Sequence, residues 1–121
     1  MSRRLTALLA PALAGTFAAA ALAATPTIVV TPNEVHRGHT VRVHGAAGGC
    51  PAGDQVTLLS RAFSAAHEFA GVPAVHARVG AHGGYSVTTR IPAARHPGRY
   101  SVSARCGGGN FGVRAPLRVL A

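Results

Sequence analysis

The stretch Val75-His76-Ala77-Arg78-Val79, followed after Gly80–Gly84 by Tyr85-Ser86-Val87-Thr88-Thr89-Arg90-Ile91, places apolar and polar side chains on alternate positions. This period of two is typical of a β-strand with one buried face, because successive side chains point to opposite faces. The glycine-rich segment between the two runs is a turn signal. We therefore predict two strands here, paired as a hairpin, with their apolar side chains facing the interior.

Outward from this stretch, further apolar or alternating runs bring the number of predicted strands to seven: Thr27–Val30, Thr40–His44, Val56–Leu59, Val75–Val79, Tyr85–Ile91, Tyr100–Cys106 and Ala115–Leu120. Short strands separated by turn residues, with no amphipathic helix after residue 26, predict an all-β chain arranged as an immunoglobulin-like β-sandwich. The segment Ser60–Pro73 fits neither period. It is compatible with a long connection or with one helical turn.

The N-terminal segment has the parts of a secretory signal. Arg3 and Arg4 precede the apolar run Leu5–Ala20, and Ala21-Leu22-Ala23 supplies the small residues that signal peptidase accepts. We predict a signal peptide over 1–23, a single domain over 24–121 and a secreted or cell-surface location. Retention of the apolar run as a membrane anchor is the alternative, and the export route, Sec or twin-arginine, stays open.

Two cysteines are present, Cys50 before the predicted third strand and Cys106 at the end of the sixth. In an immunoglobulin-like sandwich these strands are antiparallel neighbours, so the two residues lie at the same edge of one sheet. An exported chain is also outside the reducing pool of the cell. We predict a disulfide between them, the alternative being two separate buried thiols.

The charge is strongly unbalanced: the sequence has 12 arginines, no lysine and three acidic residues, for a net charge of +9 with neutral histidines. Such a surface attracts polyanions in a way that salt screens. The arginines are scattered singly and are not interleaved with aromatic residues, which argues against specific nucleic-acid binding. Arginine without lysine, beside abundant alanine and glycine, also fits a GC-rich coding sequence.

Potential metal ligands and catalytic groups are sparse. His36, His39 and His44 are close in sequence, but zinc needs three or four converging ligands, and histidines that solvate outer strand faces are the plainer explanation. Three carboxylates and no nucleophile motif leave little for acid–base or covalent chemistry. We therefore expect no cofactor, no bound metal and no enzymatic activity. The three carboxylates are Glu34, Asp54 and Glu68.

The run Cys106-Gly107-Gly108-Gly109-Asn110-Phe111-Gly112 is the most unusual segment. Its glycines allow a partner to approach closely, which makes Asn110 and Phe111 candidate contacts at the loop end of the sandwich. In the plainer interpretation the glycines permit positive backbone angles and Phe111 covers the end of the core.

Several segments of the domain carry a family resemblance: Thr27–Pro32, Arg37–Gly45, Cys50–Asp54, Pro97–Tyr100 and Ala104–Gly108. Over nearly all of the domain the chain resembles a widespread group of small secreted immunoglobulin-like proteins of actinobacteria. The resemblance implies export and fold, and says little of function.

Through its opening strands alone the chain is distantly similar to the neocarzinostatin family, whose members hold an enediyne chromophore in a cleft of a seven-stranded sandwich. That family has two disulfides and is acidic, whereas this chain has one cysteine pair and is basic.

Two functions follow as hypotheses. The first is an extracellular interaction or structural module, monomeric and free of the membrane after cleavage, that binds a protein or a cell-wall polymer through the loops at the disulfide end. The second is a small-molecule carrier with a cleft between the sheet and the Ser60–Pro73 connection, beside Phe63 and Phe69.

Overall fold

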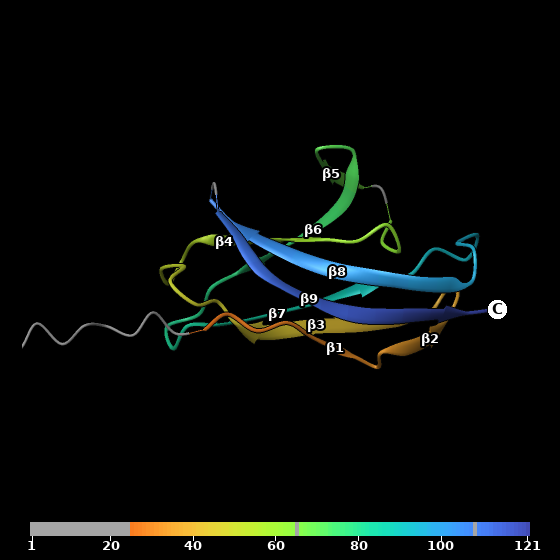
Figure 1. The fold of residues 1–121 in the computed structure, drawn as a ribbon, viewed down its shortest axis with the longest axis horizontal. Helices are drawn as coiled ribbons and strands as arrows, with labels where there is room; N and C mark the ends of the chain where they lie inside the picture. The colour runs from red at the N-terminus through yellow and green to blue at the C-terminus, as the bar shows by residue number, and fades with distance from the viewer. Residues whose placement is uncertain (1–24, 65, 108) are drawn as a thin grey trace, which may run out of the picture.

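The computed structural model describes residues 25–64, 66–107 and 109–121; the predicted signal peptide, 1–23, lies outside the described residues. The described chain consists of strands and connections without a helix (Figure 1). The strands are β1 (Val29–Thr31), β2 (Glu34–His36), β3 (Thr40–Ala46), β4 (Gln55–Leu59), β5 (His67–Phe69), β6 (Val72–Arg78), β7 (Gly84–Arg90), β8 (Gly98–Cys106) and β9 (Gly109–Leu120). The all-β prediction is confirmed.

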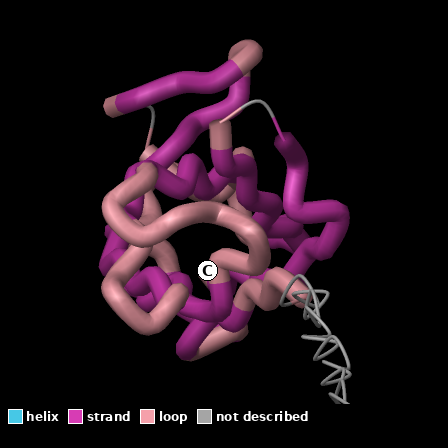
Figure 2. Tube along the Cα trace, turned by 90° about the vertical axis from the view of Figure 1, so that its left-hand side faces the viewer, coloured by secondary structure: helices cyan, strands magenta, loops and turns pink. Residues whose placement is uncertain are grey.

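These strands form two sheets. A three-stranded sheet has the order β1-β3-β7, and a six-stranded sheet has the order β2-β9-β8-β4-β6-β5. In Figure 1 the three-stranded sheet lies below β8, β4 and β6, and the β5 end of the larger sheet projects at the top. The view turned by 90° shows the strands of both sheets around a shared interior (Figure 2).

The core fills the space between the sheets because each strand turns its alternate apolar side chains inward. The predicted inward residues are confirmed as buried or as packed against the core; they are Val41, Val43, Tyr85, Val87, Ile91, Tyr100, Val102, Ala104, Cys106, Leu117 and Val119. Burial of these side chains is the main favourable term in folding a chain of this size.

The predicted hairpin between 75–79 and 85–91 is wrong. β6 pairs with β4 and β5 in the larger sheet, whereas β7 pairs with β3 in the smaller sheet. The glycine-rich segment between them carries the chain from one sheet to the other. Alternation of side chains reports which face of a strand is buried but not which strand lies beside it, and this is why the pattern misled.

Nine strands are described where seven were predicted. The additional strands are β2, which runs parallel to β9, and β5, which comes from the Ser60–Pro73 segment and pairs with β6. The final strand begins at Gly109 and not at Ala115, so most of the glycine-rich segment that was expected to form a loop belongs to a β8–β9 hairpin.

Candidate functional site

The disulfide end of the molecule contains the predicted bond between Cys50 and Cys106, whose Cα atoms are 6.0 Å apart. β4 and β8 are antiparallel neighbours, and Val56 in β4 lies opposite Cys106. The bond therefore joins the loop that precedes β4 to the end of β8, as predicted. A hollow of about 390 Å³ lies at this end, lined among others by both cysteines, Asn110 and Phe111.

The two candidate contact residues at this end are engaged within the chain. The Asn110 side-chain oxygen accepts a hydrogen bond from the Gly112 amide at 2.8 Å. The half-buried Phe111 ring packs edge-on against Tyr85, with the ring centres 6.0 Å apart. Gly112 has a φ of 77°, which a residue with a side chain rarely adopts. These contacts match the interpretation in which the glycines permit positive backbone angles and Phe111 covers the end of the core. They do not test whether Asn110 and Phe111 also contact a partner.

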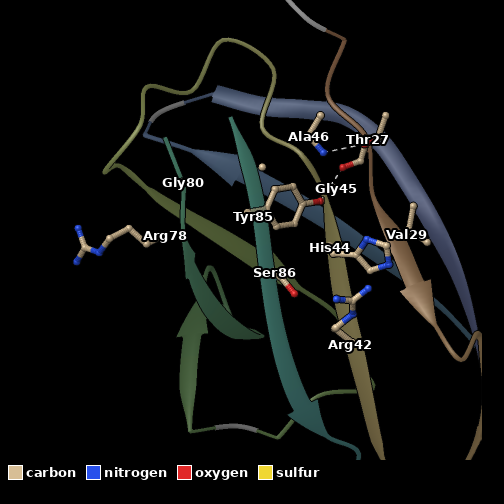
Figure 3. Close-up of a pocket in the computed structure, with 11 residues that line it drawn as sticks. Thr27, Val29, Arg42, His44, Gly45, Ala46, Arg78, Gly80, Tyr85 and Ser86 are labelled. Carbon is tan, nitrogen blue, oxygen red and sulfur yellow. Dashed lines mark hydrogen bonds between the residues drawn. The ribbon is translucent and has the colours of Figure 1, made fainter. Parts of the chain in front are cut away.

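Tyr85 also clamps the start of the described chain. Its hydroxyl donates to the Thr27 carbonyl at 2.7 Å, and the Thr27 hydroxyl accepts from the Ala46 amide at 2.8 Å (Figure 3). A Cβ at Gly45 would overlap the Thr27 carbonyl, so only glycine allows this approach. Burial raises the pKa of Tyr85 to about 12.

A wide, shallow hollow lies around these residues on the three-stranded sheet. Arg42 and His44 project from β3 near Val29, while Arg78 extends away from them (Figure 3). All three side chains line the hollow, Arg42 and His44 from β3 and Arg78 from β6.

Of the three histidines considered as metal ligands, His36 and His39 have ring centres 6.1 Å apart, and His36 and His44 have hydrogen-bond partners within the chain. His36 Nδ1 lies 2.8 Å from the carbonyl of Ala121, and His44 Nε2 lies 3.3 Å from the Thr31 hydroxyl. Within the described part of the chain, the one cluster of three potential ligands is Cys50, Asp54 and Cys106. Its two sulfur atoms are joined in the disulfide and are not the thiolates that bind metal.

The three carboxylates lie on separate elements. Glu34 in β2 faces Arg118 at 3.6 Å, Asp54 lies before β4, and Glu68 lies in β5. All three are exposed. A paired acid and base would need two of them in one site.

Arginines gather on the outer face of the six-stranded sheet, a feature that the one-dimensional sequence did not reveal. Strand alternation and register place five arginines there: Arg78 on β6, Arg99 and Arg105 on β8, and Arg114 and Arg118 on β9. They are half of the arginines that follow the N-terminal segment. Among the described residues, Glu34 at the far edge is the only acidic residue that register places on this face.

A cleft of about 450 Å³ opens on this face, between the sheet and the connection that follows β4. Arg61, Arg99 and Arg114 line it, together with Leu59, Ser60, Val72, Tyr100, Ser101 and Ser103. The carrier hypothesis places a cleft in this region beside Phe63 and Phe69, but neither lines it. Phe63 is fully buried in the core, and Phe69 is 40% exposed with the Arg105 guanidinium 4.8 Å from its ring centre.

Two imidazoles lie side by side at the other end of this face. The rings of His67 and His76 are 5.0 Å apart, and the Gln55 side-chain amide nitrogen lies 2.8 Å from His76 Nδ1. No cluster of three ligands in the described residues includes them.

No helix in the described residues has the length and apolar character needed to span a membrane. No known family model matches the sequence, and no curated protein matches it. Part of the Pseudomonas fluorescens alkylpurine DNA glycosylase AlkC, solved bound to DNA containing an abasic site analog, is similar in structure, with a TM-score of 0.55 and 18% identity. The match covers 78% of this chain and 29% of that chain, and at this identity it shows a likeness of fold alone.

Proposed function

We propose that this chain is an exported, non-catalytic binding module with an immunoglobulin-like fold, which recognises an acidic polymer of the cell wall. The fold assignment is supported by strand order: β1-β3-β7 corresponds to the A, B and E strands of such domains, and β9-β8-β4 to the G, F and C strands. Export is supported by the N-terminal sequence pattern and by a disulfide suited to an oxidising compartment.

One observation carries the binding role: the arginines on the outer face of the six-stranded sheet. Guanidinium groups on one face attract a polyanion over the whole face and pair directly with its oxyanions. Asn110 and Phe111 at the disulfide end form a second contact surface in this proposal, because a hollow lies beside them.

Cosedimentation with isolated cell walls tests the role. The purified protein is mixed with walls that retain their anionic polymers, at about 0.15 M salt, and with neutral cross-linked dextran as the control. We expect the protein to sediment with the walls and to be released at about 1 M salt, since ion pairs are screened there. If the protein stays in the supernatant when the walls sediment, the proposal is overturned.

A small-molecule carrier is a second candidate, favoured by the cleft of about 450 Å³ on the outer face. Because three arginines line this cleft, a carried ligand would be anionic and not the apolar chromophore of the neocarzinostatin family. Native mass spectrometry of the protein isolated from its producing culture tests this. An adduct of constant mass supports the carrier, and the bare chain mass counts against it.

A further inference from the structure

Three arginines without an internal partner converge on the outer-face cleft. The side chains of Arg61, Arg99 and Arg114 are exposed, and none of the three guanidinium groups has a hydrogen bond or ion pair to another described residue. Other arginines are engaged: Arg78 donates to the Gly53 carbonyl at 2.7 Å and Arg95 to the Phe63 carbonyl at 2.7 Å. The cleft therefore holds charged donors that structural hydrogen bonds do not explain.

The lining of the cleft offers donors and no carboxylate. Ser101 and Ser103 line the cleft together with the three arginines. Phosphate presents more acceptor oxygens than carboxylate does, in a geometry that guanidinium groups bind bidentately. This combination of guanidinium and hydroxyl donors favours phosphate as the bound group.

The cleft continues along the sheet. A neighbouring hollow of about 230 Å³ shares Arg99 and Tyr100 with it and extends to Arg118, which Glu34 faces at 3.6 Å. Arg114 lies four residues before Arg118 in β9, and Arg118 is opposite Arg99, so Arg99 and Arg114 are about 14 Å apart along the sheet. Charges at this spacing suit a ligand with repeated anionic groups better than a single ion.

The cleft and the neighbouring hollow together form a trough. The aromatic residue that lines it, Tyr100, is not free to stack on a base. The Tyr100 hydroxyl donates to the His96 carbonyl at 2.6 Å, and its ring packs against the core. Single-stranded nucleic acids are bound through exposed aromatic rings as well as basic groups. The trough therefore favours a polymer without bases.

We propose that the trough binds a linear cell-wall polymer with repeating phosphate groups, held by Arg61, Arg99 and Arg114 with Ser101 and Ser103. This inference rests on the proposed function and names its ligand class and site. The serine hydroxyls in the lining can donate hydrogen bonds to phosphate oxygens, which attraction by net charge alone does not require.

Fluorescence anisotropy with labelled linear inorganic polyphosphate tests the trough, using the full protein and two matched double variants. R99Q/R114Q removes two charges inside the trough, and R37Q/R42Q removes two exposed, unpartnered arginines elsewhere in the described chain. We expect R99Q/R114Q to weaken binding about tenfold and to lower the slope of log affinity against log salt by about 1.4. R37Q/R42Q should change affinity less than about twofold.

Other probes give the outcomes that would overturn the inference. Equal losses from the two double variants would mean diffuse attraction, and tighter binding of poly-glutamate or oligo(dT) than of polyphosphate would assign another ligand class. Should R99Q/R114Q fail to fold, R61Q gives an independent test of the same cleft. If the wild type and R99Q/R114Q are retained equally on cell walls, the trough is refuted and the proposed function stands. If the wild type is not retained on cell walls, the proposed function itself is refuted.

Discussion

Tyr85 joins three parts of the molecule at one residue. Its ring lies in the core and against Phe111, and its hydroxyl reaches the Thr27 carbonyl at 2.7 Å. Gly45, the register partner of Tyr85 in β3, leaves room for the segment that contains Thr27. A buried phenol with one hydrogen-bond acceptor is stable in its neutral form, so this clamp depends on pH.

Unfolding experiments at alkaline pH test the clamp. The phenol ionises near pH 10 in the unfolded chain, while burial raises the pKa of Tyr85 to about 12 in the folded chain. Between these values the unfolded state binds fewer protons, so the free energy of unfolding should fall as pH rises from about 10 to about 12 and stay unaffected by this group below that window. Denaturant titrations at a series of pH values measure the change.

Tyr85→Phe should flatten this fall and cost about 1 kcal/mol at neutral pH, because the hydrogen bond to Thr27 is lost. Tyr100→Phe is the matched control, since it also removes a phenol that donates to a carbonyl. An alkaline fall that persists unchanged in Tyr85→Phe would show that another group causes it.

At the scale of elements, the connection between β4 and β6 both covers the core and forms one wall of the trough. Phe63 is fully buried, and the Arg95 guanidinium donates to its carbonyl. The hydroxyl of the buried Ser60 accepts from the Ala62 amide at 3.1 Å. These contacts fix the connection at the position where Arg61 reaches the cleft.

Alanine substitutions should separate the two phenylalanines of this connection. Phe63→Ala removes a completely buried ring and should lower the free energy of unfolding by about 3 to 5 kcal/mol. Phe69→Ala, at a 40% exposed site under Arg105, should cost about 1 kcal/mol or less. Chemical denaturation of both variants gives the comparison. Similar losses would mean that β5 carries more of the stability than its exposure indicates.

At the scale of the whole molecule, the disulfide ties together the ends of a long part of the chain. Cys50 and Cys106 are 56 residues apart in sequence, and the closed loop contains β4 to β7 and nearly all of β8. Cross-linking removes conformational freedom from the unfolded chain, by an amount that grows with the logarithm of the loop size. A loop of this size therefore contributes a substantial share of the stability of a small domain.

Removal of the disulfide by the double variant C50A/C106A should lower the free energy of unfolding by about 4 kcal/mol. Guanidinium titration of the oxidised wild type and the variant measures the difference, and an intact mass two hydrogens below the reduced value establishes the bond in the wild type. Coincident unfolding curves would contradict the expected contribution of the cross-link.

Much of the local structure could be predicted from the sequence. Alternation at Val41 and Val43, and again at Leu117 and Val119, identified buried strand faces that the structure confirms. The pairing of β6 with β7 was wrong, and the short strand β5 was missed because exposed residues over three positions carry no alternating signal. Strand β2 was missed because its alternation extends over only three residues, too few to identify a strand.

The sequence by itself determined the all-β class, the inward faces of the main strands and the cysteine pair, because side-chain alternation and cysteine count are written along the chain. Only the tertiary structure decided which strands are neighbours and where the charges gather. Arg61, Arg99 and Arg114 are scattered in sequence, and they meet in one cleft because the chain returns to the same sheet after crossing to the other. Contacts between distant residues depend on how the sheets pack, which local periodicity does not encode.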